Sequence, residues 1–111
     1  MNPITFSETP AFLRSRRDLM DDAALERMME AIALDPESGT VIPGTGGLRK
    51  LRWSRPGLGK RGGLRIIYYI VTPENVCILL MVYAKSQTGD LSPDARRRLV
   101  RAVEQIKGVD R

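Results

Sequence analysis

The sequence has 111 residues, of which 42% are hydrophobic, and this composition predicts one folded domain across residues 1–111 instead of a disordered chain. Its formal net charge of +5 favours a polyanionic partner, either nucleic acid or an acidic protein, over a merely solvated basic surface. The absence of histidine and the single cysteine exclude Ser–His and Cys–His nucleophilic catalysis and argue against a zinc site.

The chain shows no pattern typical of export or membrane insertion. Its first residues lack a basic region followed by an apolar segment, so we expect no signal peptide. The longest apolar run, Val76–Ala84, is far shorter than the about 20 residues that cross a bilayer. Cys77 lies in this run without a possible disulfide partner, which predicts a buried structural thiol and fits a reducing compartment. We therefore expect a cytoplasmic protein.

The first part of the chain predicts a short strand and two helices. Ile4–Phe6 is typical of a strand, and Thr9-Pro10 is a helix start, with a capping hydroxyl followed by proline at the first position. A second helix begins at Asp21-Asp22 and ends near Pro36 and Gly39, and its apolar face consists of Leu25, Met28, Met29 and Ile32. The two helices are expected to form an antiparallel hairpin.

Three further strands are expected between residues 48 and 85. The segment Leu48–Ser54 alternates between two faces, as a strand does. Pro56–Gly62 is typical of a flexible basic loop. Leu64–Val71 and Val76–Lys85 are rich in β-branched and aromatic residues, which favours strands. Both are apolar on both faces, which predicts the centre of a sheet that helices cover on each side.

A last helix is predicted after the polar loop Ser86–Leu91. It begins at Ser92-Pro93, and its apolar stripe consists of Ala95, Leu99, Val103 and Ile106. Its other faces carry Arg96, Arg97, Arg98 and Arg101. The predicted order β-α-α-β-β-β-α indicates an α+β fold, a small antiparallel sheet packed by an N-terminal helical hairpin and a C-terminal helix.

The middle of the sequence is basic and free of acidic residues. No Asp or Glu occurs between Glu37 and Glu74, whereas the same stretch contains Arg49, Lys50, Arg52, Arg55, Lys60, Arg61 and Arg65. Lys50 and Arg52 share one face of a strand, about 7 Å apart. Arg65 opens the next strand and Lys85 ends the last one. If these strands pair in order, the four cations converge on one face or at one edge of the sheet.

Such a cluster either holds an anion or takes part in catalysis. RNA cleavage by 2′-hydroxyl attack needs a base, a group that stabilises the charge on phosphorus, and an acid for the 5′-oxygen. Arginine offers a planar fork to phosphate oxygens, and lysine serves as a base once neighbouring positive charge lowers its pKa. From the residues alone, binding without catalysis is somewhat favoured. No cofactor is expected, because neither glycine-rich segment has the phosphate-loop pattern.

Three segments resemble the RelE/HigB superfamily of bacterial type II toxin–antitoxin toxins, most closely its HigB-like branch: Gly44–Trp53, Gly59–Tyr69 and Val82–Lys85. The resemblance covers nearly the whole chain, including the helical hairpin and the entry to the last helix at Asp90-Leu91-Ser92-Pro93. It implies a RelE-like α+β fold and cleavage of messenger RNA in the ribosomal A site. It also implies neutralisation by a cognate antitoxin, so the expected partners are the ribosome, mRNA and this antitoxin.

The resemblance further implies roles for individual residues. Lys50 or Arg52 is expected to assist deprotonation of the 2′-hydroxyl, Arg65 to hold the phosphate, and Lys85 to bind RNA or stabilise charge. Because of their charge, and not through the resemblance, the remaining cations of the basic stretch are also expected to bind RNA: Arg49, Arg55, Lys60 and Arg61. The sequence differs from that of some relatives at one position and in one segment. Ser86 stands where some have an arginine, and residues 90–93 lack the tyrosine or histidine that some use there.

Two other interpretations stay open. A ParE-like toxin has the same superfold but inhibits DNA gyrase by binding, without cleaving anything, so the fold alone does not separate it from a nuclease. A plain RNA- or protein-binding module would use the same basic face for contact only. The stacked basic residues on the sheet favour RNA as the ligand.

Overall fold

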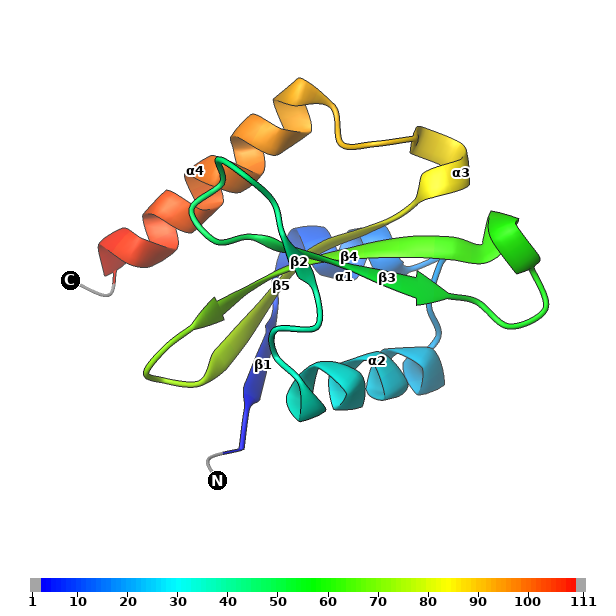
Figure 1. The fold of residues 1–111 in the computed structure, drawn as a ribbon, viewed down its shortest axis with the longest axis horizontal. Helices are drawn as coiled ribbons and strands as arrows, with labels where there is room; N and C mark the ends of the chain where they lie inside the picture. Colours follow the sequence, from blue (N-terminus) through cyan, green and yellow to red (C-terminus); the bar gives the residue numbers. More distant parts are fainter. Residues whose placement is uncertain (1–2, 110–111) are drawn as a thin grey trace.

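The structure, a computed structural model, describes residues 3–109 apart from the side chains of Lys60 and Val109. Its strands are β1 (Thr5–Glu8), β2 (Thr40–Val41), β3 (Arg49–Ser54), β4 (Gly63–Val71) and β5 (Val76–Ala84). Its helices are α1 (Pro10–Arg16), α2 (Asp22–Leu34), α3 (Lys85–Thr88) and α4 (Pro93–Val109), with a 3-10 turn η1 (Gly59–Gly62) before β4. The strands form one sheet in the order β1-β5-β4-β3-β2 (Figure 1).

The predicted α+β fold is confirmed, and one feature of the predicted sheet is wrong. β3, β4 and β5 pair antiparallel in order, but β1 pairs with β5 in parallel, so the sheet is mixed. Side chains alternate with the same period in parallel and antiparallel strands, so the residue pattern carried no information about this direction. The two predicted loops also contain short helical elements. η1 lies within the loop predicted over residues 56–62, and α3 begins at Lys85 and extends into the loop predicted from Ser86.

Helices cover the sheet on both faces. On one face, Phe12 of α1 and Met28 and Ile32 of α2 pack on Leu64, Tyr68 and other apolar residues of β4 and β5. On the other face, Leu99 and Val103 of α4 pack on Ile67 and Leu80. This arrangement confirms the central position predicted for β4 and β5. Cys77 is buried as expected, and burial raises the pKa of its thiol to about 12.

The outer edge of β5 is protected by α1. β1 pairs only with residues 76–79 of β5, so the rest of that strand has no strand beside it on this side. The Thr9 hydroxyl donates to the carbonyl oxygens of Leu79 (2.9 Å) and Leu80 (3.3 Å), and the Ser15 hydroxyl accepts from the backbone N–H of Val82 at 3.0 Å. Two hydroxyl side chains therefore satisfy backbone groups that a further strand would otherwise pair.

Tyr68 fixes the connection between α2 and the sheet. Its fully buried hydroxyl accepts a hydrogen bond from the Gly39 N–H (2.8 Å) and donates one to the Pro36 carbonyl oxygen (2.9 Å). Position 39 needs glycine, because an added Cβ would lie 2.7 Å from that hydroxyl oxygen.

We expect Tyr68→Phe to lower the free energy of unfolding by about 1–3 kcal/mol, because the Gly39 N–H would stay buried without its acceptor. Urea denaturation followed by circular dichroism measures the change. Tyr69→Phe is the matched control, since the Tyr69 hydroxyl makes no hydrogen bond within the described residues and the phenylalanine ring would still face the Lys107 ammonium. Equal losses in the two variants would contradict this role of the Tyr68 hydroxyl.

Candidate functional site

Two of the predicted cations lie directly opposite each other on neighbouring strands. Arg52 of β3 pairs with Arg65 of β4, and Arg65 pairs in turn with Tyr83 of β5. Residues opposite each other share a sheet face with Cβ atoms about 5 Å apart, so the three side chains form one cross-strand row. Lys50 lies on the same face, two residues from Arg52. The strands therefore bring three of the four predicted catalytic residues together.

A register irregularity between β4 and β5 determines which residue of β5 lies opposite Arg65. Near the turn, Val71 pairs with Val76, and a regular hairpin would then place Val82 opposite Arg65. The register shifts by one residue between Ile67 and Tyr68, and this shift brings Tyr83 beside Arg65 instead. The bulge therefore selects an aromatic phenol, in place of an aliphatic side chain, as the neighbour of the arginine.

The row is open to an anion. Arg52 is exposed and Arg65 is half-buried, with its Nη1 atom donating to the Leu64 carbonyl oxygen at 3.1 Å. The basic partners of the ion pairs within residues 3–109 are Arg16 and Arg97, so neither Arg52 nor Arg65 forms an ion pair there. Two guanidinium groups opposite each other repel, and an anion bound between them relieves that repulsion. The arrangement can hold a phosphate at two strands at once.

Tyr83 of β5 is the buried member of the row, next to Arg65. It is only 6% exposed and packs with Leu99 and Val103 beneath α4. Burial raises the pKa of its phenol, the nearby Asp90 carboxylate raises it further, and the positive charge of Arg65 acts in the opposite direction. The phenol therefore remains protonated at neutral pH. Asp90 is an acidic neighbour of the site that residue patterns did not indicate, because it belongs to the loop before α4.

Lys85 lies at the same end of the sheet but outside β5. It is the first residue of α3, directly after Ala84, and Ala84 pairs with Leu64, the chain neighbour of Arg65. The side chain of Lys85 is exposed. The sequence predicted it as the last residue of the strand, and the structure places it one residue beyond.

The remaining predicted RNA-binding residues are not gathered in the row. Arg49 lies on the opposite face of β3 from Lys50, and its guanidinium donates to the carbonyl oxygens of Gly39 (2.7 Å) and Glu37 (3.3 Å). Arg55 folds back on η1, donating to the carbonyl oxygens of Gly62 and Arg61. Arg61 is exposed, whereas the side chain of Lys60 lies outside the described residues. An RNA-binding role for these four residues stays a prediction.

Residues 3–109 contain neither a metal-binding cluster nor a membrane-spanning helix. No group of three or more Cys, Asp or Glu residues there could hold a metal ion. No helix in that part is both long and apolar enough to cross a bilayer.

Comparison with known proteins identifies the architecture that carries this row. No family model matches the sequence. The structure is similar to that of the E. coli toxin RelE in the free state, a double arginine-to-alanine mutant, with a TM-score of 0.58 and 15% identity over 78% of this chain and 88% of that one. It is also similar to the RelBE2 toxin–antitoxin complex from Mycobacterium tuberculosis, with a TM-score of 0.52 and 16% identity over 75% of this chain and 99% of that one. The chain therefore has the RelE-like toxin fold.

Proposed function

We propose that this protein is a ribosome-dependent endoribonuclease that cleaves messenger RNA in the A site and so inhibits translation. The observation that carries the proposal is the pair of Arg52 and Arg65, which lie opposite each other on β3 and β4 and form no ion pair within residues 3–109. The RelE-like fold of the chain supports the same assignment. The oxygens of a phosphodiester fit two adjacent guanidinium forks.

The reaction would proceed by transesterification within the RNA. The 2′-oxygen forms a bond to phosphorus while the bond from phosphorus to the 5′-oxygen breaks, leaving a 2′,3′-cyclic phosphate and a 5′-hydroxyl. Lys50 or Arg52 assists removal of the 2′-hydroxyl proton, and solvent water at the exposed site gives a proton to the departing 5′-oxygen. Arg65 holds the non-bridging phosphate oxygens, and Lys85 adds positive charge beside the developing dianion. No step requires a metal ion or a cofactor.

The ribosome would supply what the small open site lacks. In-line attack needs the 2′-oxygen, phosphorus and 5′-oxygen to be aligned, and holding reactants in that geometry lowers the barrier by several kcal/mol (about 7–11 in well-oriented systems). An exposed row on a sheet does not impose such a geometry on flexible RNA. We therefore expect cleavage of translated mRNA and little cleavage of free RNA.

The proposed partner is a cognate antitoxin that neutralises the protein in the cytoplasm. The similarity to a toxin–antitoxin complex supports this part of the proposal. The excess positive charge of the chain, +5, favours an acidic protein as that partner.

Primer extension on a defined mRNA tests the proposal, using the purified chain with and without translating ribosomes. We expect cuts that appear only with ribosomes and that keep the codon register. Cuts of equal intensity in free RNA would contradict ribosome dependence. The absence of cuts in both reactions, with protein shown to be folded and free of antitoxin, would overturn the nuclease assignment. DNA supercoiling by gyrase would then be assayed.

A further inference from the structure

A polar hollow lies at the end of the sheet where β3 begins and β4 ends. Its volume is about 510 Å³, within the range of about 300–1,000 Å³ that is typical of small-molecule sites. Three segments that are distant in the sequence line it: the turn after α2, the glycine-rich loop before β3, and the end of β4 with the hairpin turn that follows. Its polar and aromatic lining includes Glu37, Arg49 and Tyr69, and we call it the Glu37 hollow.

Two opposite charges in the Glu37 hollow lie close together without pairing. The Glu37 N–H donates to Oδ1 of Asp35 (3.2 Å), and its carbonyl oxygen accepts from Nη1 of Arg49 (3.3 Å), so the backbone of Glu37 is tied on both sides. Neither Glu37 nor Arg49 forms an ion pair within residues 3–109. The hydrogen bonds of Arg49 within that range come from Nη1, so Nε and Nη2 stay available as donors. The hollow thus presents a carboxylate acceptor beside guanidinium donors.

Tyr69 adds an aromatic ring to the same hollow. It is half-buried, and the Nζ atom of Lys107 lies 6.0 Å from the centre of its ring. The loop beside it consists of glycines, since an added Cβ at Gly47 would lie 3.2 Å from Cε1 of Tyr69, and one at Gly46 would lie 3.1 Å from Nζ of Lys107. The missing side chains leave both the ring and the ammonium accessible to a ligand.

The groups that line the hollow match the edges of guanine. Guanine presents the acceptor O6 beside the donors N1–H and N2–H₂, and arginine is the usual donor to its O6 and N7 atoms. A carboxylate accepts from N1–H and N2–H₂ together. Adenine has a lone pair at N1 in place of the N–H, so the Glu37 carboxylate would repel it. Unpaired bases are held by an aromatic ring on the base plane and hydrogen bonds to the base edges, and the hollow offers both.

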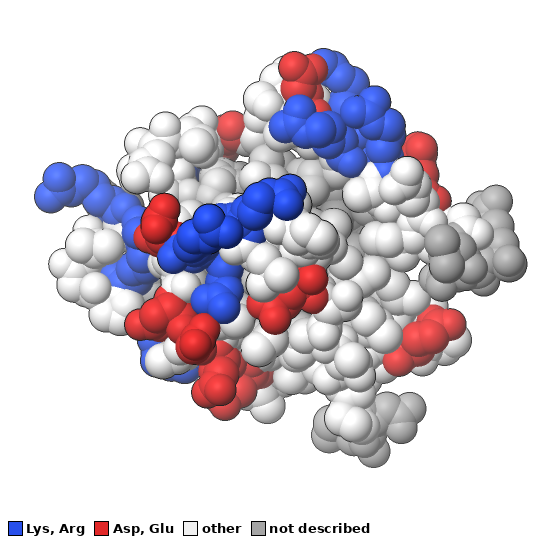
Figure 2. Space-filling view, turned by 180° about the vertical axis from the view of Figure 1, so that it is seen from behind, with Lys and Arg blue, Asp and Glu red and all other residues white. Residues whose placement is uncertain are grey.

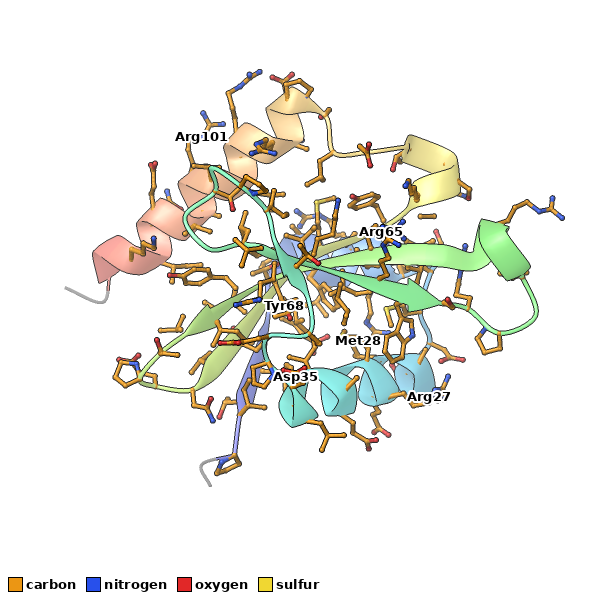
Figure 3. The ribbon with its side chains drawn as sticks, viewed as in Figure 1. Arg27, Met28, Asp35, Arg65, Tyr68 and Arg101 are labelled. Carbon is orange, nitrogen blue, oxygen red and sulfur yellow. The ribbon has the colours of Figure 1, made fainter. Side chains whose placement is uncertain are left out.

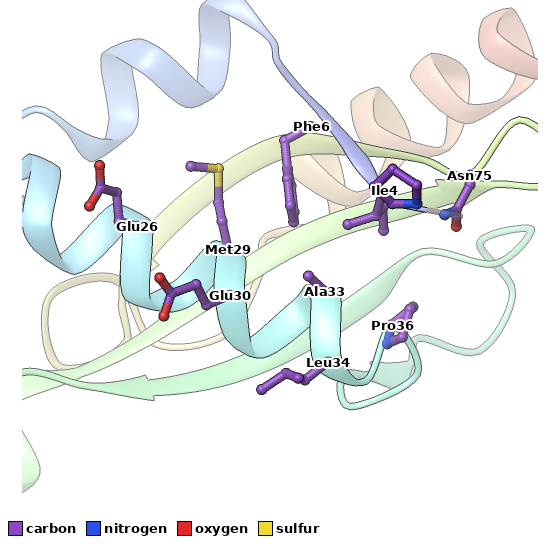
Figure 4. A pocket seen from close by; sticks show the side chains of 10 residues that line it. Ile4, Phe6, Glu26, Met29, Glu30, Ala33, Leu34, Pro36 and Asn75 are labelled. Carbon is purple, nitrogen blue, oxygen red and sulfur yellow. The ribbon is translucent and has the colours of Figure 1, made fainter. Parts of the chain in front are cut away.

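Other charged or hollow regions of the molecule lack this combination. Figure 2 shows basic side chains spread over α1 and α4, which attract any polyanion without distinguishing its bases. The hollow between α2 and β1 has two carboxylates, Glu26 and Glu30, and the ring of Phe6 (Figure 4). Among the described residues that line it there is no arginine or lysine, so it offers no cationic donor to O6.

From these contacts we propose that the Glu37 hollow binds an unpaired guanine, either of a free nucleotide or of RNA. Tyr69 lies against the base, Glu37 accepts from N1–H and N2–H₂, and Arg49 donates to O6. The site is separate from the row of Arg52 and Arg65, because Tyr69 is four residues, or about 13 Å, from Arg65 along β4. Guanine binding therefore requires neither the ribosome nor cleavage, and it is measured without either.

Titration of the full chain with GMP and AMP, followed in amide NMR spectra, tests the proposal. GMP should shift the signals of Gly46, Gly47 and Ile70 and should bind at least about tenfold more tightly than AMP. Glu37→Gln should weaken GMP binding by about tenfold without weakening AMP binding. Glu30→Gln is the matched control, since it removes the same charge from the neighbouring hollow and should leave both affinities unchanged.

The ring and the source of the guanine are tested separately. Tyr69→Leu should weaken GMP binding, whereas Tyr69→Phe should preserve it, because stacking needs the ring and not the hydroxyl. A short oligoadenylate with one central guanosine distinguishes the sources. Tighter binding of this RNA than of GMP assigns RNA as the source, and equal binding assigns a free nucleotide.

Three results would overturn the proposal. The first is equal affinity for GMP and AMP, and the second is unchanged GMP binding by a folded Glu37→Gln protein. The third is the absence of shifts at residues 46, 47 and 70 of the folded chain with both GMP and the guanosine-containing RNA at about 5 mM. Cleavage of mRNA by the row would be unaffected by any of these results.

Discussion

Replacement of Arg65 by alanine should reduce ribosome-dependent cleavage by about 100- to 1000-fold, the loss typical when one preorganised contact to developing charge is removed. Arg65 is the central member of the cross-strand row, between Arg52 and Tyr83. The variant should remain folded, because within residues 3–109 this side chain makes a single hydrogen bond, to the carbonyl oxygen of the preceding residue. Single-turnover cleavage on programmed ribosomes measures the effect.

Two matched variants separate the phosphate contact from general attraction. Arg27→Ala removes the same charge from α2, on the other side of the sheet, and should cleave at the original rate (Figure 3). Arg65→Lys keeps the charge but loses the planar fork, so its rate should lie between those of the original chain and Arg65→Ala. Unchanged cleavage by a folded Arg65→Ala protein would remove this arginine from the mechanism.

Phe12→Ala should cost about 3–5 kcal/mol of unfolding free energy, the largest loss of stability that we predict. Phe12 is the only buried residue of α1 and is 0% exposed. Seven residues are too few for a stable isolated helix, so α1 depends on this ring and on its Thr9 cap. Small domains are stable by only about 5–15 kcal/mol, so the variant would lose a large share of its stability.

The neighbouring residue provides the control for Phe12. Leu13 is 46% exposed, and Leu13→Ala should lower the unfolding free energy by less than about 1 kcal/mol. Urea midpoints of the two variants, compared with that of the original chain, measure the difference. Similar losses in both would show that α1 is not held through the Phe12 ring.

The fold was predictable where side-chain periodicity reports burial. β4 and β5 are apolar on both faces because helices cover both, and α4 shows a stripe because only one side of it packs. The parallel direction of β1 was not predictable, since β1 is short and the alternation of its side chains does not depend on direction. The two-residue strand β2 was missed because it is too short to carry any period.

The candidate site was predictable only in part. Alternation placed Lys50 and Arg52 on one face, and the order of strands then brought Arg65 beside them. The pairing of Arg65 with Tyr83 depends on a one-residue bulge, which no local residue pattern indicated. Arg49 was grouped with the site on charge alone. Its contacts with carbonyl oxygens of residues 37 and 39 arise from the path of the chain between α2 and β3.

The hydroxyl contacts along β5 also bear on how copies of this chain behave toward one another. Open sheet edges are where identical chains add strand to strand and grow into aggregates. One edge of this sheet ends in the two-residue β2. On the other side, the hydroxyls of Thr9 and Ser15 bind the backbone of β5 at residues 79 and 82. The strand segments that stay open on their outer side are short: the four residues of β1 and residues 51–54 of β3, which β2 does not reach. The apolar hairpin of β4 and β5 lies inside these edges and therefore offers little free backbone to another copy of the chain.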